Sequence, residues 1–252
     1  MRRLGQHFLS DPKILERIVD ALEPKRSDVV LEIGPGKGSL TRALLARGVK
    51  VIAVERDREL AAALDAHENL TVISGDALTL DWHQYDANKV IGNIPYYITS
   101  PLIDKALTPP LPERVVFLVQ AEVADRMAAP PGTKTYGALS VGVQAVCRVE
   151  KLFTIAAGAF RPPPKVRGAV VRLTPRAAPL IEPEEVASFR KFVTACFSRR
   201  RKQLRNVMAG VTGLPVARVA DDLRALGLDP AARPEILPPH AFVRLLRWSL
   251  QL

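Results

Sequence analysis

Cysteine is scarce in this chain, and its scarcity excludes a class of protein. Among 252 residues there are two cysteines, Cys147 and Cys196, and they form no CxxC pair. A framework of disulfides or cysteine-bound metal needs more cysteines at closer spacing. We therefore predict two buried, apolar cysteines in a reducing compartment, and no metal site.

Long apolar runs are also missing. No segment approaches the length of a membrane span, and the N-terminus lacks the apolar core of a signal peptide. We expect a soluble, monomeric, cytoplasmic protein without a membrane partner.

Acidic residues are too few to balance the basic ones. The chain has 36 Lys and Arg against 26 Asp and Glu, which gives a net charge of +10 and a pI of about 9.9. Such an excess favours nucleic acid or another anionic surface as partner. A basic but otherwise ordinary enzyme is the alternative.

The length of the chain and a change in its character predict two domains. Apolar content of 48% and charged content of 25% are typical of globular proteins. Residues 1–175 alternate strand-like and helix-like segments, whereas residues 176–252 read as helical throughout, at 184–198, about 201–210, 216–226 and 239–250. The second segment holds 13 basic and 7 acidic residues, against 23 and 19 in the first.

A glycine-rich turn follows the first strand-like run, at residues 28–33. It fits neither a phosphate loop, which needs GxxxxGK[ST], nor a dinucleotide fingerprint, because Ser39 stands three residues after Gly36. The pattern is Glu-x-Gly-x-Gly-x-Gly, beginning at Glu32 and including Gly34 and Gly36. This form is typical of class I S-adenosylmethionine methyltransferases. Glycines at these positions let the backbone approach a ligand closely.

Acidic residues end the next two predicted strands. Glu55 closes the strand at 50–54, 21 residues after Gly34, where a carboxylate can bind ribose hydroxyls. Asp76 follows the strand at 70–73 and suits an adenine amino group. Because ligands bind at the carboxyl ends of parallel strands, the turn and both acids predict one cofactor site. A solvent-facing Glu55 is the alternative.

The strand at 89–92 delivers Asn93, Ile94, Pro95 and Tyr96, which together can hold a flat, hydrogen-bonding ring. Phe160 precedes three consecutive prolines, whose stiff, extended backbone can fix one aromatic ring in a site. In the helical segment, a basic cluster lacks neutralising acids and favours phosphate contact over a merely solvated face. Its members are Arg199, Arg200, Arg201, Lys202 and Arg205.

The combination of motifs resembles the KsgA-type small-subunit rRNA adenine dimethyltransferases over almost the whole chain. The motifs are Gly5–Leu9, Val30–Thr41, Glu55, Gly75–Ala77, Asn93–Tyr96, Phe160–Val166, Arg200–Leu204 and Leu226–Glu235. The resemblance implies an α/β fold, with a Rossmann-like methyltransferase domain at 1–175 and a small helical RNA- or ribosome-contacting domain at 176–252.

The resemblance also implies a cofactor, a substrate and site residues. Cofactor contacts fall on His7, Leu9, Gly34, Glu55, Asp76 and Asn93, with His7 where many members have asparagine. The implied reaction is S-adenosylmethionine-dependent dimethylation of two adjacent adenosines in the 3′-terminal hairpin of 16S rRNA, on an immature 30S particle.

The residues themselves predict a mechanism based on positioning. The adenine amine is a poor nucleophile, and the Asn93 side-chain oxygen and Ile94 carbonyl can each accept one of its N–H groups. Pro95 fixes φ, while Tyr96 and Phe160 can sandwich the ring and favour the cation that forms. No general base is required.

Three alternatives stay open at this point. One is an Erm-like enzyme acting on 23S rRNA, and another is a nonenzymatic RNA-binding assembly or transcription factor. An intact set of Glu55, Asp76 and Asn93–Tyr96 argues against the latter. A small-molecule methyltransferase would leave the basic helical segment unexplained.

Overall fold

The structure is a computed structural model that describes residues 7–199 and 201–252, apart from the side chain of Tyr96. The predictions for Arg200 and for the Tyr96 ring therefore lie outside the described residues. No helix in the described part of the chain is long and apolar enough to cross a membrane.

The chain divides into two compact units. The first contains residues 1–124 and 149–175, and the second contains residues 125–148 and 176–252. One boundary coincides with the expected division at 175/176. Residues 125–148, which the sequence placed in the first domain, group instead with the second, because their apolar side chains pack among its helices.

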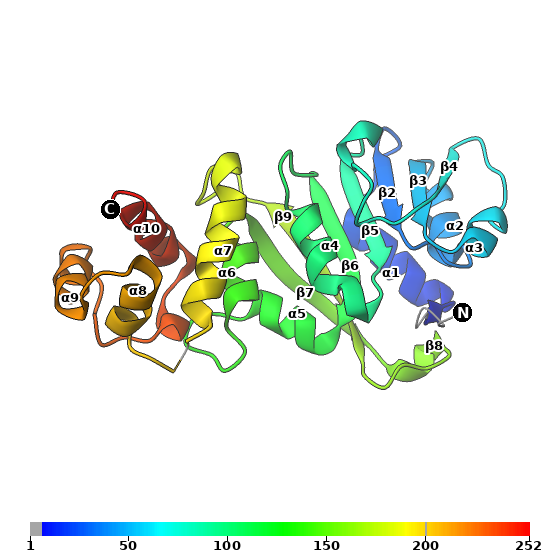
Figure 1. The fold of residues 1–252 in the computed structure, drawn as a ribbon. Helices are drawn as coiled ribbons and strands as arrows, with labels where there is room; N and C mark the ends of the chain where they lie inside the picture. Colours follow the sequence, from blue (N-terminus) through cyan, green and yellow to red (C-terminus); the bar gives the residue numbers. More distant parts are fainter. Residues whose placement is uncertain (1–6, 200) are drawn as a thin grey trace. The chain divides into compact units, whose positions relative to one another are not determined.

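The first unit is built on a seven-stranded sheet of order β4-β3-β2-β5-β6-β9-β7 (Figure 1). Its strands are β2 (Val29–Ile33), β3 (Lys50–Glu55), β4 (Leu70–Ser74), β5 (Lys89–Asn93), β6 (Arg114–Gln120), β7 (Cys147–Ile155) and β9 (Gly168–Pro175). The five strands β4, β3, β2, β5 and β6 are parallel to one another, and β9 pairs antiparallel with β6. Strands β2, β3, β4 and β5 coincide with the runs at 28–33, 50–54, 70–73 and 89–92 that were predicted as strands, which confirms the α/β class.

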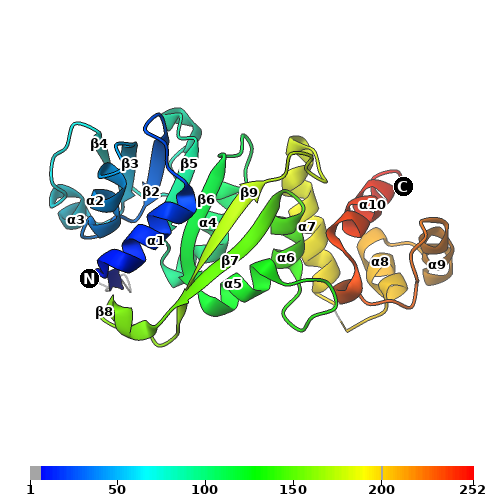
Figure 2. The ribbon, with the colours of Figure 1, turned by 180° about the vertical axis from the view of Figure 1, so that it is seen from behind.

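Helices cover both faces of this sheet. They are α1 (Pro12–Leu22), α2 (Ser39–Leu45), α3 (Arg58–Ala62) and α4 (Thr99–Ala106). Helix α5 (Ala121–Ala128) follows β6, and the division between the two units falls within it. Helix α4 lies in front of the sheet in Figure 1, and α1 lies in front of it in the reverse view of Figure 2. The Asp11 carboxylate caps α1 by accepting from the backbone N–H of Lys13 at 2.9 Å.

A buried ion pair closes the amino ends of the central strands. The Lys89 ammonium donates to Asp28 and to the carbonyl of Glu23, each at 2.6 Å, and both charged side chains are almost fully buried. Asn88 donates to the same Asp28 carboxylate and accepts from the Val29 backbone. These polar groups hydrogen-bond to one another and hold β2 beside β5. A ligand site is therefore expected at the opposite, carboxyl ends of the strands.

The second unit is helical. It contains α6 (Ala138–Gln144), α7 (Val186–Phe197), α8 (Leu204–Thr212), α9 (Val216–Ala225) and α10 (Pro239–Ser249). Four of these correspond to the predicted C-terminal helices, although α8 begins at 204 rather than near 201. The second unit also contains the short 3₁₀ helices η4 (Pro183–Glu185) and η5 (Pro234–Ile236), and the first contains η1 (His83–Tyr85), η2 (Tyr96–Ile98) and η3 (Ala157–Ala159).

Aromatic side chains form the core of the second unit. Phe197 stacks on Phe242 with ring centroids 5.5 Å apart, and the Tyr136 ring meets Phe197 edge-on at 6.2 Å. The Tyr136 hydroxyl donates to the Leu237 carbonyl at 2.7 Å. Cys147 and Cys196 are buried as predicted, and burial raises the pKa of each thiol to about 12.

Candidate cofactor and substrate site

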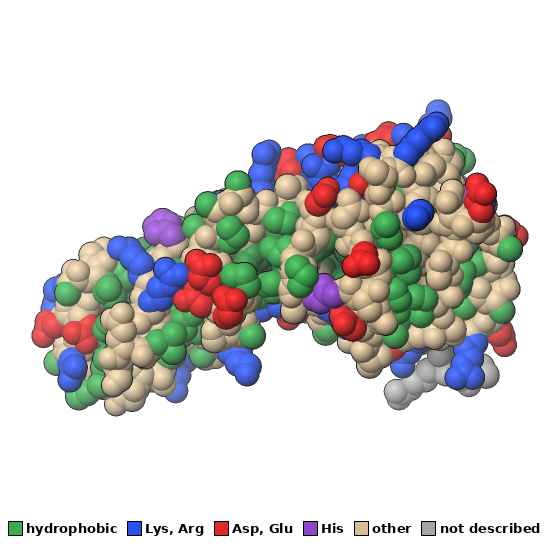
Figure 3. All heavy atoms as spheres, turned by 90° about the horizontal axis from the view of Figure 1, so that it is seen from above, with side chains coloured by type: hydrophobic (Ala, Val, Ile, Leu, Met, Phe, Trp, Pro, Cys, Tyr) green, Lys and Arg blue, Asp and Glu red, His purple; other side chains and the backbone are tan. Residues whose placement is uncertain are grey.

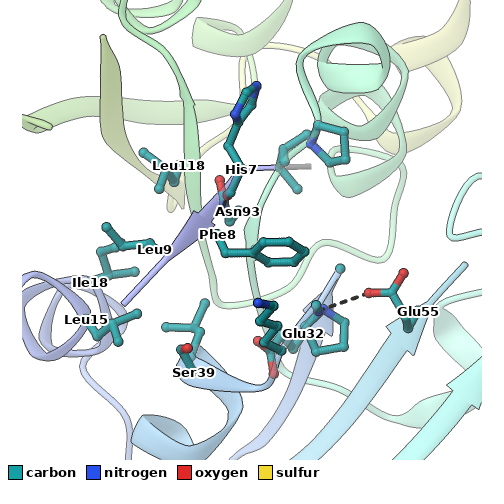
Figure 4. A pocket seen from close by; sticks show the side chains of 18 residues that line it. His7, Phe8, Leu9, Leu15, Ile18, Glu32, Ser39, Glu55, Asn93 and Leu118 are labelled. Atoms are coloured by element: carbon teal, nitrogen blue, oxygen red, sulfur yellow. Dashed lines mark hydrogen bonds between the residues drawn. The ribbon is translucent and has the colours of Figure 1, made fainter. Parts of the chain in front are cut away.

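The carboxyl ends of β2, β3 and β5 meet at one cavity of about 920 Å³, measured with its open mouth (Figure 4). The predicted residues His7, Leu9, Gly34, Gly36, Glu55, Asn93, Ile94 and Pro95 all line it. Residues that are up to 88 positions apart in the sequence are thus brought into one site.

The glycine turn between β2 and α2 needs its glycines. Gly34, Gly36 and Gly38 have φ values of 70°, 57° and 73°, a region that other residues rarely adopt. A Cβ added to Gly36 would lie 2.9 Å from the Phe8 ring. The turn therefore exposes backbone, with no side chain of its own in the way, to whatever occupies the cavity.

Glu55 is built into the wall of this cavity. One carboxylate oxygen accepts from the Gly36 backbone N–H at 3.0 Å, the dashed line in Figure 4, and the other accepts from Asp57 at 2.9 Å. Each carboxylate oxygen can accept a second hydrogen bond. Glu55 is thus fixed in place and still has acceptor capacity for hydroxyl groups of a ligand.

Glu32 is a site residue for which the sequence predicted no role. It lies on β2, lines the cavity and is 1% exposed, and neither of its carboxylate oxygens has a hydrogen-bond partner among the described residues. Burial raises its pKa to about 7, the nearby Thr41 hydroxyl partly offsets this, and the negative charge of Glu55 adds to it. The only sequence feature that could have indicated a site role for Glu32 was its place as the first residue of the Glu-x-Gly pattern.

The Asn93 amide is oriented by the N-terminal strand. Its Nδ2 donates to the backbone carbonyl of His7 at 2.9 Å, so its Oδ1 is left as an acceptor. The next residue, Ile94, donates its N–H to Leu118 at 3.0 Å, and no described residue donates to the Ile94 carbonyl. Two neighbouring acceptors, one from a side chain and one from the backbone, are therefore available.

The N-terminal strand β1 (Phe8–Leu9) pairs antiparallel with β8 (Phe160–Arg161). His7 joins the same contact, with its Nδ1 at 2.7 Å from the Pro162 carbonyl. The Phe8 ring projects into the cavity, where Lys37 Nζ lies 5.1 Å from the ring centroid (Figure 4). The sequence predicted neither strand, since each has only two residues.

Phe160, predicted to hold the substrate ring, lies outside the cavity in this structure. Its ring is 1% exposed, packs in the core and does not line the cavity, so it offers no face to a base. The cause is the pairing with β1, in which Leu9 lies opposite Phe160, together with the space left beside the ring by Gly168.

Asp76 stands at the end of β4 as predicted, but outside the cavity lining. Its Oδ1 accepts from Leu78 at 2.9 Å, and its Oδ2 lies 3.6 Å from Arg56. Its side chain is partly exposed, so it remains accessible beside the site rather than within it.

The basic cluster occupies the connection between α7 and α8. Among the described members, Arg199, Arg201 and Lys202 are exposed and Arg205 is half-buried. Within the described chain, none of these four has an acidic partner within 4.0 Å. On the face drawn in Figure 3, basic side chains are interspersed with acidic ones. What distinguishes the cluster is therefore that its described members have no acidic partner.

The open parallel sheet, its glycine turn and the acid that ends the following strand define a Rossmann-like, S-adenosylmethionine-dependent methyltransferase. The family model for ribosomal RNA adenine dimethylase matches residues 1–226. The chain belongs to the ribosomal RNA adenine dimethylase family and is an rRNA adenine dimethyltransferase that uses S-adenosylmethionine.

Individual relatives agree with this assignment. Proteins named ribosomal RNA small subunit methyltransferase A are 43% identical in Acidithiobacillus ferrooxidans, over 99% of this chain and 94% of the relative, and 44% identical in Bordetella bronchiseptica, over 97% and 92%. A solved dimethyladenosine transferase from Plasmodium falciparum has a TM-score of 0.83 at 30% identity and covers 97% of this chain and 98% of its own. The 23S rRNA methyltransferase ErmE has a TM-score of 0.74 at 30% identity, with coverages of 97% and 100%.

Proposed function

We propose that the chain dimethylates the N6 amines of two adjacent adenosines in the 3′-terminal hairpin loop of 16S rRNA, on an immature 30S subunit. The small-subunit names of relatives that match over at least 92% of their length support this choice of RNA. The observation that carries the chemistry is the Asn93 amide, fixed by the His7 carbonyl beside the free Ile94 carbonyl.

The residues present fit the cofactor. Glu55 has acceptor capacity for ribose hydroxyls, the glycine turn offers close backbone approach, and the unpaired Glu32 carboxyl suits the cationic groups of the cofactor. His7 and Leu9 bound the same cavity, and Asp76 stands beside it for the adenine amino group. When bound, S-adenosylmethionine supplies a methyl group activated by its sulfonium.

Asn93 and Ile94 orient the substrate amine. Each oxygen accepts one N–H of the N6 amine, which directs the nitrogen lone pair toward the centre of the cavity. The Pro95 ring fixes φ at −57° and removes an N–H that could compete for these acceptors. Correct orientation, rather than proton transfer by a side chain, is the contribution of these residues to the rate.

Aromatic contacts complete the proposal. We assign Tyr96 to one face of the target adenine, where a ring contributes roughly 0.5–2 kcal/mol to a neighbouring cation. Phe160 can reach the other face only if its ring leaves the core, which requires β8 to shift relative to β1. We therefore place Phe160 in the site only when substrate is bound.

The remaining proposals concern the partner. The basic cluster, defined above as Arg199, Arg201, Lys202 and Arg205 with Arg200, contacts rRNA phosphates. We propose that the protein acts as a monomer. Reaction on a 30S precursor places the protein in the cytoplasm.

The test is to incubate the protein with methyl-labelled S-adenosylmethionine and immature 30S particles, and then to map the label. We expect label on two adjacent adenosines, and Asn93→Ala should abolish transfer while the cofactor still binds. Asn88→Ala is the matched control, because Asn88 supports the opposite end of β5, and its kcat should be retained at temperatures where the variant is folded.

Three outcomes oppose the proposal. Label confined to added 23S RNA would identify an Erm-like specificity. No label in any RNA, with the cofactor bound, would favour a nonenzymatic assembly role. Normal methylation by Asn93→Ala would refute the orientation mechanism while leaving the choice of RNA intact.

A further inference from the structure

Tyr97 is an exposed aromatic ring beside the substrate-orienting residues. Its side chain is 57% exposed, and it is the one aromatic among the large hydrophobic residues that are exposed in residues 7–199 and 201–252. Its hydroxyl has no hydrogen-bond partner in the described structure. Protein packing therefore does not account for the ring at this position.

The backbone under Tyr97 is fixed relative to the site. Tyr97 is the middle residue of η2, and the carbonyl of Pro95 accepts from the Ile98 N–H at 3.1 Å and from the Thr99 hydroxyl at 3.3 Å. Pro95 itself lines the cavity. The chain thus turns tightly after the two acceptors, and Tyr97 is held within two residues of the cavity wall.

The substrate creates a need for such a ring. An adenine that enters the cavity leaves the base stack, at a cost of a few kcal/mol. The base next to it loses a stacking partner at the same moment. An aromatic side chain that receives this neighbouring base restores part of the lost stacking, without selecting its identity.

We propose that Tyr97 is a stacking platform for the nucleotide adjacent to the adenine that is being methylated. This inference rests on the proposed function, in which two target adenosines are neighbours. Tyr97 therefore contacts the substrate outside the methyl-transfer site and contributes to RNA affinity and to the position of the strand, not to cofactor binding.

The test compares Tyr97→Leu with Tyr97→Phe on immature 30S particles. Leucine keeps an apolar side chain without a π-face, whereas phenylalanine keeps the π-face without the hydroxyl. We expect Tyr97→Leu to lower kcat/KM for RNA by about 5- to 150-fold, mainly through KM, and Tyr97→Phe to stay within about twofold of the wild type. Direct titration should give the same cofactor Kd for all three proteins.

The controls separate this inference from the function on which it rests. If the wild type labels adjacent adenosines of the small-subunit RNA and Tyr97→Leu matches its kcat/KM, the stacking role is refuted. The same conclusion follows if Tyr97→Phe loses as much as Tyr97→Leu, or if Tyr97→Leu weakens cofactor binding in proportion. If the wild type labels no such pair, the proposed function itself fails, and the stacking role fails with it.

Discussion

At the scale of the residue, the least satisfied group in the site is the Glu32 carboxyl. It is buried, has no hydrogen-bond partner among the described residues, and shares its cavity with Glu55 and Lys37. The neutral acid is favoured in these surroundings, and its pKa is raised to about 7. A cationic ligand in the cavity reverses this preference, since an adjacent positive charge stabilises the carboxylate.

Cofactor affinity should therefore depend on the ionisation of Glu32. Below pH 7 the free protein carries a proton on Glu32 that must leave as the cofactor binds, so affinity should rise about tenfold per pH unit and level off above pH 7. Calorimetry in buffers of different ionisation enthalpy should detect release of about one proton at pH 6 and much less at pH 8.

Glu32→Gln provides the comparison, because it keeps the shape of the side chain and cannot ionise. Its cofactor affinity should be weaker at pH 8 and flat between pH 6 and pH 7. The same ionisation affects folding with the opposite sign. As pH rises from 4.5 to about 7, the unfolded chain ionises first, so the contribution of Glu32 to the free energy of unfolding falls. A variant that still releases the proton would contradict this assignment.

Spacing along single strands predicted which residues line the cavity at the ends of β2, β3 and β5. It could not predict the burial of Phe160, which depends on the pairing of β1 with β8. Nor could it predict the hydrogen bond from Asn93 to His7, which joins residues far apart in the sequence. The glycine motif includes Glu32, but only the structure shows that its carboxyl is buried without a hydrogen-bond partner among the described residues.

At the scale of the element, the connection between α7 and α8 concentrates positive charge. Arg199, Arg201 and Lys202 are exposed there, and no acidic residue in the described part of the chain pairs with them. The Arg199 guanidinium lies over Gly210 of α8, where any side chain would collide with it. Exposed arginines on other helices of the same unit are paired, as Arg218 is with Asp222 and Arg224 with Asp221. Free cations are the ones that can replace counterions on RNA.

Neutralising Arg199, Arg201 and Lys202 to glutamine should weaken RNA binding and flatten its salt dependence. Each phosphate contact that is lost should reduce the slope of log K against log salt by about 0.7–0.9. Cofactor Kd should not change. Filter binding or fluorescence anisotropy with immature 30S RNA across a salt series provides the measurement.

The matched control removes the same charge from paired residues of the same unit, as the triple change of Arg218, Arg224 and Arg247 to glutamine. This control should leave the slope near that of the wild type. Equal losses in both triple variants would show that net charge alone matters, and unchanged binding in the first would make the cluster a solvated surface.

Long, regular elements were predictable because their signals are local. The seven strands of the large sheet are apolar runs bounded by turns, and the helices of the second unit show apolar residues at helical spacing, such as Phe189 and Val193 on α7. Strands β1 and β8 carry no such signal in two residues each, and they form only because each is the other's partner.

At the scale of the molecule, the two units are interleaved in sequence. The chain passes from the first unit into the second at residue 125 and returns to the first after residue 148. Helix α6, which lies in this segment, packs against α7 and α10. Tyr136, which is 1% exposed, contributes its ring to the cluster with Phe197 and its hydroxyl to Leu237. Composition changes at residue 175 because the C-terminal helices begin there, but composition cannot show that an earlier segment shares their core.

A fragment of residues 1–175 should therefore fold poorly, although it ends at a natural boundary. Its segment 125–148 would expose Tyr136 and the face of α6 that packs against α7 and α10, because both of those helices lie beyond residue 175. A second fragment, in which a flexible glycine-serine linker replaces residues 125–148, removes that exposed surface. We expect the linker fragment to melt cooperatively and the simple fragment to melt at a lower temperature and bind a hydrophobic dye. If residues 1–175 alone melt as sharply and at as high a temperature as the linker fragment, then segment 125–148 does not depend on the C-terminal helices, and the division into two interleaved units would be wrong.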